Sequence, residues 1–109
     1  MTSFHSVRTR LINYRELEPN WDSYRALRIE DECIERAIRF CDVAEEKKLD
    51  PPGAAPLNDG GVNLYWNNED ITVDFRPGGQ LEINFEINGK ESLRVCEKVF
   101  SVVQITLNS

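Results

Sequence analysis

The chain has 109 residues, and its 19 acidic residues outnumber its 13 lysines and arginines, which gives a formal net charge of −6. A chain of this length usually forms one core, so we expect a single domain over residues 1–109. The acidic balance excludes direct nucleic-acid binding by phosphate neutralisation, and no apolar run approaches the roughly 20 residues needed to cross a bilayer. Because no apolar leader follows Met1, we expect a cytoplasmic protein without membrane contacts.

The charge is distributed unevenly along the chain. Residues 1–28 carry a net charge of +2, residues 29–61 carry −5, residues 62–89 carry −4 and residues 90–109 carry +1. The middle of the chain therefore presents negative charge, and its natural complement is a basic surface of another protein.

Two helices are predicted in the first half of the chain. Phe4, Val7, Leu11 and Tyr14 recur at helical spacing, which predicts a helix over 4–17 that ends before Pro19. A second helix is predicted over 30–48, with acidic residues in its first turn and lysines in its last. Its apolar stripe consists of Ile34, Ala37, Ile38, Phe40, Cys41 and Ala44. Residues 50–61 contain three prolines and three glycines and are expected to form an irregular loop.

From residue 62 the apolar period changes from 3.6 to 2. The alternation predicts three half-buried strands, at 62–66, 71–75 and 81–87. The connections at 67–69 and 76–79 are short enough for hairpins, so we expect an antiparallel meander with one solvent-exposed face.

The segment 91–107 fits either a helix or a strand. Its length and its non-alternating valine pairs favour a helix over about 91–104, against a high β-branched content that favours a strand. The predicted architecture is α+β with the order α-α-β-β-β-α. The 30–48 helix and the C-terminal helix are expected to cover the apolar face of the sheet.

The exposed face of the predicted meander is rich in carboxylates. Asp70, Asp74, Glu82 and Glu86 are expected there, with no basic residue among them. Such a face is either a solvated surface that prevents aggregation or a binding surface for a basic groove, for example on a nucleic-acid-handling complex. A metal site is the weakest interpretation, because the chain contains no ligand spacing typical of Mg²⁺ or Ca²⁺ loops, and we expect none.

Catalysis is not expected from this sequence, so we predict a protein that is not an enzyme and that needs no cofactor. His5 is the only histidine, and the nucleophile-elbow, Walker A and dinucleotide-binding motifs are absent. Cys33, Cys41 and Cys96 are odd in number, lie among apolar residues and are expected to be buried thiols.

Two segments resemble a known group of proteins. Residues 17–26, Leu-Glu-Pro-Asn-Trp-Asp-Ser-Tyr-Arg-Ala, resemble the stretch L-P-x-N-W-D-G-Y-G-A of a large group of small bacterial and phage proteins, and residues 59–66 resemble their D-G-G-V-x-L-x-W stretch. Ser23 and Arg25 replace the glycines of the first motif, which puts the conformation of that turn in question. The resemblance implies a small α+β domain from a bacterium or its mobile elements, and it brings no assigned activity.

We therefore expect a small acidic interaction protein that binds and inhibits or regulates a basic surface of a partner, in the manner of anti-CRISPR proteins or antitoxins. The predicted partner-binding residues are Asp70, Asp74, Glu82, Glu86, Tyr65, Trp21 and Tyr24. Trp21 and Tyr24 also have a structural interpretation, in which they fill the gap between the first helix and the core. The alternatives are a small-ligand binder, with a pocket between the 50–61 loop, Trp21 and the sheet edge, or a structural subunit that self-associates as a homodimer through its C-terminal segment.

Overall fold

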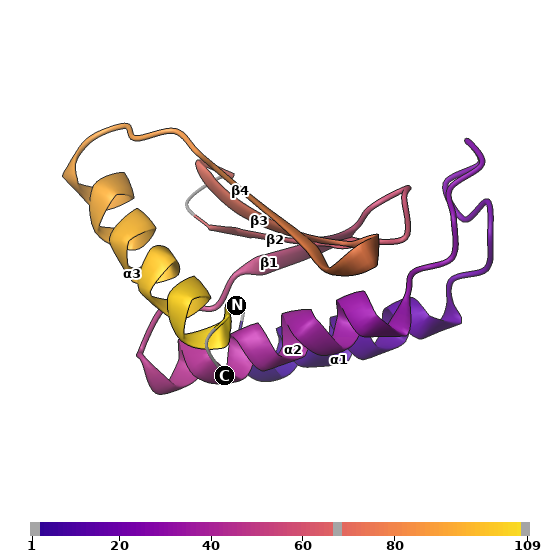
Figure 1. Ribbon diagram of the computed structural model, residues 1–109, viewed down its shortest axis with the longest axis horizontal. Helices are drawn as coiled ribbons and strands as arrows, with labels where there is room; N and C mark the ends of the chain where they lie inside the picture. Colours follow the sequence, from indigo (N-terminus) through magenta and orange to yellow (C-terminus); the bar gives the residue numbers. More distant parts are fainter. Residues whose placement is uncertain (1–2, 67–68, 108–109) are drawn as a thin grey trace.

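The computed structural model describes residues 3–66 and 69–107. Three α-helices and four β-strands form an α+β fold (Figure 1). In chain order the elements are α1 (Phe4–Asn13), the short 3-10 helix η1 (Tyr14–Glu16), α2 (Asp31–Glu46), β1 (Gly53–Pro56), β2 (Val62–Trp66), β3 (Ile71–Arg76), the 3-10 turn η2 (Pro77–Gly79), β4 (Gln80–Phe85) and α3 (Lys90–Leu107).

The sheet is an antiparallel meander with the strand order β1-β2-β3-β4. The prediction of three strands was wrong, because β1 lies inside the segment expected to be an irregular loop. Gly-Ala-Ala-Pro has side chains too small and too few to show an alternating pattern, and only its pairing with residues 62–65 of β2 makes it a strand. The predicted turn at 67–69 lies mostly outside the described residues, at Asn67 and Asn68.

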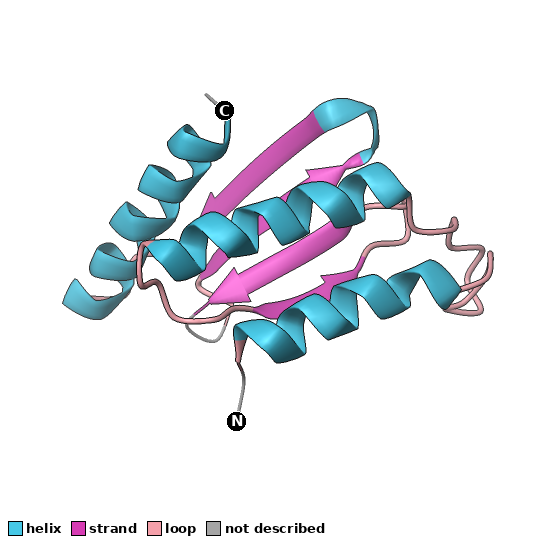
Figure 2. Ribbon diagram, turned by 90° about the horizontal axis from the view of Figure 1, so that it is seen from below, coloured by secondary structure: helices cyan, strands magenta, loops and turns pink. Residues whose placement is uncertain are grey.

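The helices pack against one side and one end of the sheet. Figure 2 shows α1 and α2 side by side across this side, whereas α3 crosses near one end of the strands. The expected covers were α2 and α3, and α1 is a third one that packs beside β1 and α2. No helix of the described residues lies on the other side of the sheet (Figure 1).

The core forms between the helices and the inner face of the sheet. Phe40 of α2 is fully buried, and its ring centroid lies 5.8 Å from that of Trp66 and 5.7 Å from that of Phe75. Burying such a side chain contributes roughly 1.5–3 kcal/mol to folding. This aromatic cluster joins α2 to β2 and β3 and fixes the orientation of the helix layer.

The two N-terminal helices are shorter than predicted. Tyr14–Glu16 form the 3-10 helix η1 at the end of α1. At the end of α2, Lys48 adopts a positive φ of 61°, and the N–H of Leu49 donates to the carbonyl of Ala44 at 2.9 Å. This is a Schellman-type ending, which glycine usually marks. Because a lysine occupies this position, the sequence did not indicate that the helix ends here.

The C-terminal segment is a helix, as predicted. Its buried residues Ser92, Cys96, Val99 and Val103 recur every three or four positions, so helical packing overrides the β-branched content of the segment. No helix of the described residues is long and apolar enough to span a membrane.

Candidate binding face

The side of the sheet without helices carries the polar half of the strand alternation. In β2 the buried residues Val62, Leu64 and Trp66 alternate with the half-buried Asn63 and Tyr65. Period and register assign the following residues to this side: Gly53, Ala55, Asn63, Tyr65, Thr72, Asp74, Arg76, Gln80, Glu82 and Asn84. We call this surface the open face.

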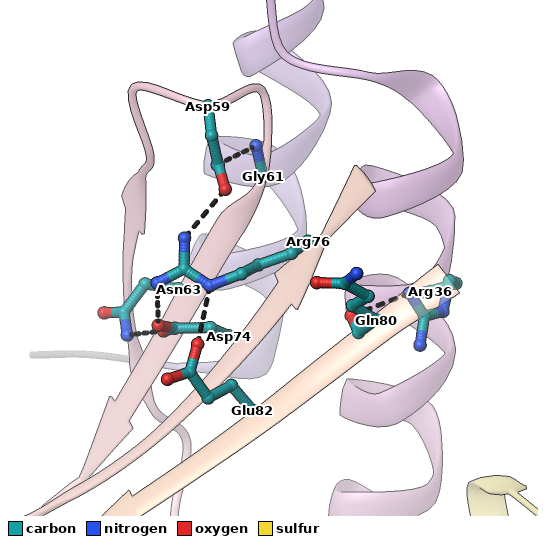
Figure 3. Close-up of polar contacts among 8 residues, drawn as sticks. All are labelled: Arg36, Asp59, Gly61, Asn63, Asp74, Arg76, Gln80 and Glu82. Atoms are coloured by element: carbon teal, nitrogen blue, oxygen red, sulfur yellow. Dashed lines mark hydrogen bonds and ion pairs between the residues drawn. The ribbon is translucent and has the colours of Figure 1, made fainter. Parts of the chain in front are cut away.

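Arg76 occupies the centre of a polar cluster on the open face (Figure 3). Its Nη1 lies 2.7 Å from Asp59 Oδ2, its Nη2 3.0 Å from Asp74 Oδ2 and its Nε 2.8 Å from Glu82 Oε2. Asn63 Nδ2 donates to the other oxygen of Asp74 at 2.5 Å. One guanidinium thereby holds three carboxylates from the loop before β2, from β3 and from β4.

The loop before β2 is shaped to bring Asp59 into this cluster. The other oxygen of Asp59 accepts a hydrogen bond from the N–H of Gly61 at 3.0 Å, and Gly60 has a φ of 95°. A Cβ on Gly61 would lie 2.5 Å from the carbonyl oxygen of Phe75, so the loop passes against the β3 backbone only because this residue has no side chain.

The structure corrects the expectation of an exposed face without a basic residue. Arg76 was assigned to the turn after the predicted strand 71–75, but it is the last residue of β3 and it faces Asp74 and Glu82. Arg76 follows Thr72 and Asp74 at a spacing of two residues, and this spacing was the signal in the sequence that it shares their face of the strand. Asp59, Asn63 and Arg76 are thus site residues that the prediction of partner contacts missed.

The predicted acidic residues differ in their availability to a partner. Asp74 is 7% exposed and is enclosed by Asn63 and Arg76, whereas the carboxylate of Glu82 reaches solvent. Asp70 precedes β3 and accepts a hydrogen bond from the hydroxyl of Ser92 at 3.1 Å, in the first turn of α3. Glu86 follows β4 and is exposed. Of the four predicted acidic residues, Glu82 and Glu86 are therefore the most accessible to a partner.

The electrostatics of the cluster leave an excess of negative charge. Three carboxylates surround one guanidinium, and the hydrogen bonds that Arg76 donates to Asp59 and then to Glu82 raise its pKa above the usual value. Arg76 therefore stays positively charged at any physiological pH. The cluster presents a net negative surface whose carboxylates are held in fixed positions.

The three predicted aromatic anchors lie in different places. Tyr65 lies on the open face, and its ring covers Gly53, where a Cβ would lie 2.2 Å from ring atoms. Trp21 is half-buried against the core and donates through Nε1 to the carbonyl of Leu27 at 3.0 Å. Tyr24 is 86% exposed at the tip of its loop, so it does not fill a gap in the core. Only Tyr65 lies on the same face as the acidic cluster.

The chain just after the first motif segment lies against the chain at the start of the second. The N–H of Leu27 donates to the carbonyl of Asn58, and the N–H of Glu30 donates to that of Gly60, both at 2.9 Å. Within the first segment, Asp22 Oδ1 accepts from the N–H groups of Tyr24 and Ala26. The residues that follow the first motif therefore support the loop that presents Asp59.

An open groove lies beside the β1 edge, away from the cluster. Its volume is about 620 Å³, and one side of α1, including His5 and Arg10, lines it together with Leu17, Trp21 and Pro56. Arg10 also reaches the carbonyl of Ala54 in β1, at 3.4 Å. Trp21 and Pro56 belong to the pocket expected from the sequence, but most of the lining comes from α1, which the sequence did not assign to a pocket.

The thiols are poorly suited to nucleophilic chemistry. Cys33, Cys41 and Cys96 are all buried, and burial raises the pKa of Cys33 to about 11 and that of Cys41 to about 12. The reactive thiolate is therefore scarce at neutral pH. Among the described residues no group of three or more His, Cys, Asp or Glu side chains is arranged to hold a metal ion.

Comparison of the chain with protein-family models, with curated proteins and with solved structures finds no match in any of the three.

Proposed function

We propose that this chain is a small acidic interaction protein, without enzymatic activity, whose open face binds a basic surface of a partner protein and thereby inhibits or regulates it. The observation that carries the proposal is the cluster of Asp59, Asp74 and Glu82 around the single guanidinium of Arg76. Its surplus carboxylates lie on a sheet surface that no helix of the described residues covers.

The rigidity of the cluster supports a binding role. Carboxylates already held by Arg76, Asn63 and Gly61 lose little side-chain entropy when a partner arrives. A lysine or arginine of the partner would add the missing positive charge to the cluster. Surface charge of this kind mainly accelerates association and selects the partner, so we expect the interaction to weaken with salt.

The nature of the partner follows from this chemistry. A basic groove is typical of proteins that handle nucleic acids, and a fixed array of carboxylates offers such a groove negative charge in place of phosphates. We place the chain in a bacterium or a mobile genetic element, acting in the cytoplasm as an antitoxin-like or anti-CRISPR-like inhibitor.

A matched charge-reversal experiment tests the proposal. Glu82→Lys/Glu86→Lys changes the open face and its margin. Glu16→Lys/Glu46→Lys makes the same change in net charge on the helix side, at two glutamates that form no ion pair with any other described residue. Binding would be measured by quantitative affinity capture from extracts of the source cells. We expect the amount of basic partner captured to fall about tenfold or more with the first variant and to stay unchanged with the second.

Two further measurements complete this test. Circular dichroism and thermal melting establish that both variants are folded, and Asn84→Lys adds positive charge beside the cluster without removing any partner of Arg76. We expect Asn84→Lys to weaken the same capture. Equal capture of the partner by the wild type and by all three variants would contradict the proposal.

A second candidate function is the binding of a small ligand in the groove beside α1. The supporting observation is the combination of an aromatic ring, Trp21, with the cation of Arg10 around a volume of about 620 Å³. Such a combination suits a small anion that carries a planar ring, because the ring stacks while the guanidinium pairs with the charge.

Thermal shift with a panel of nucleotides and aromatic acids tests this candidate. A ligand that binds only the native state stabilises it by about 2.7 kcal/mol at a hundred times its Kd, a shift of several degrees. We expect Arg10→Gln to abolish the shift, and Arg39→Gln, which changes an exposed arginine of α2, to leave it intact. An unchanged melting temperature across the panel would remove this candidate.

A further inference from the structure

The outer side of α3 carries a second apolar stripe. The buried side of α3 includes Cys96 and Val99, whereas Leu93, Phe100 and Leu107 lie seven residues apart on another side of the helix. Phe85, at the end of β4, extends this stripe, because its ring centroid lies 5.6 Å from that of Phe100 in an edge-to-face contact. We call these four residues the C-terminal apolar surface.

These side chains remain accessible to solvent. Between 38% and 63% of each of Phe85, Leu93, Phe100 and Leu107 is exposed. If a fully exposed phenylalanine contributes about 200 Å² and a leucine slightly less, the surface leaves about 350 Å² of apolar area uncovered.

The neighbouring sheet edge is also open. The β1 edge has four residues, ends in Pro56 and is reached by Arg10, all of which limit pairing with another strand. The β4 edge has six residues and contains no proline, and among the described residues it pairs with β3 alone. The less protected of the two sheet edges is therefore the one beside the C-terminal apolar surface.

The spacing of the stripe is symmetric about Phe100. Leu93 precedes Phe100 by seven residues and Leu107 follows it by seven. Two antiparallel copies of α3 related by a two-fold axis would place Phe100 on Phe100 and Leu93 on Leu107. A stripe of this kind is self-complementary, as a two-fold interface requires.

The charge pattern agrees with this pairing. Residues 80–107 carry a net charge of −1, so the remainder of the chain carries −5 of the total of −6. All charges of α3 lie within 90–98, and an antiparallel arrangement sets this half against the uncharged residues 99–107 of the second copy. Two copies of an acidic protein meet here with little repulsion.

We propose that the chain forms a two-fold symmetric homodimer through the C-terminal apolar surface, with the two α3 helices antiparallel and crossing at Phe100. Two copies of the surface bury about 700 Å² of apolar area, and since homodimer interfaces are about 65% apolar, the total is about 1,100 Å². This exceeds the roughly 1,000 Å² expected of a specific interface. The open face is not part of this contact.

Sedimentation velocity over a wide range of protein concentrations tests the proposal. We expect a concentration-dependent dimer in the wild type and, in Leu93→Lys/Leu107→Lys, a dimer dissociation constant raised about tenfold or more, because each lysine then faces a lysine. The matched control is Ile12→Lys/Leu27→Lys, which alters two apolar residues that are 47% and 59% exposed elsewhere on the molecule. A wild type that stays monomeric, or a dimer weakened equally by both variants, would overturn the proposal.

A cross-linking experiment tests the arrangement of the helices. Phe100→Cys places two thiols near the proposed two-fold axis, so mild oxidation is expected to produce a covalent dimer, while the native cysteines are buried. Ile12→Cys is the control and is expected to give little or no covalent dimer. If Phe100→Cys cross-links no faster than Ile12→Cys, the antiparallel contact at Phe100 is overturned.

Discussion

Ser23 and Arg25 both adopt an unfavourable backbone conformation that the turn at residues 20–26 requires. Their φ angles are 65° and 67°, in the left-handed region that costs most residues about 1–2 kcal/mol. The stretch that this segment resembles has glycine at both positions. The turn keeps its conformation here because Asn20 Oδ1 accepts from the N–H of Arg25 and Asp22 Oδ1 from those of Tyr24 and Ala26.

Substituting glycine at these two positions is expected to stabilise the protein. Ser23→Gly and Arg25→Gly each remove backbone strain, partly offset by the greater freedom of glycine in the unfolded chain, so each should raise the free energy of unfolding by about 0.5–1 kcal/mol. Urea denaturation measures the change. Asn88→Gly, at an exposed loop residue that is not among those with positive φ, should give no gain, and an equal gain there would contradict the explanation.

At the scale of secondary-structure elements, the sequence predicted those with a strong apolar period. The three helices and the strands β2 and β3 have buried residues at the expected spacing, and in β4 the alternating Leu81 and Ile83 are half-buried against the core. The missed element, β1, has only Ala54 as a buried residue, and its existence depends on a partner strand that a local pattern does not reveal. Long-range pairing of this kind is decided by tertiary context.

The candidate site was predictable in part for the same reason. Alternation correctly placed Asp74 and Glu82 on one side of the sheet. It did not reveal that Asp59 reaches Arg76 from a loop 17 residues away, because a contact across the sheet depends on how the loop folds back. The same limit applies to Asp70, whose contact with Ser92 requires α3 to pack beside the start of β3.

At the scale of the whole molecule, several groups that titrate at alkaline pH are buried in one core. Burial raises the pKa of Tyr14 to about 12, that of Cys33 to about 11 and that of Cys41 to about 12, from ordinary values of 10.0 for tyrosine and 9.0 for cysteine. In the unfolded chain these groups ionise at lower pH than in the folded protein. Their contribution to stability is present in full below about pH 9 and is lost as the pH rises towards about 12.

We therefore expect the free energy of unfolding to be steady near neutral pH and to fall steadily above about pH 9. Urea denaturation at a series of pH values measures this slope. Cys41→Ala should lower the stability at every pH, because it leaves a cavity, but should make the alkaline fall shallower. A free energy of unfolding that does not change between neutral pH and about pH 11 would contradict the assignment.

The meander also has a consequence for how fast the protein folds. Its consecutive strands are joined by connections of five, four and three residues, so each pairing closes a short loop at little entropic cost. The contacts of Leu27 with Asn58 and of Glu30 with Gly60 instead close loops of about thirty residues, across the whole of α2. The hairpins can therefore form early, and the docking of residues 20–30 onto the loop before β2 becomes the slow step that completes the native state.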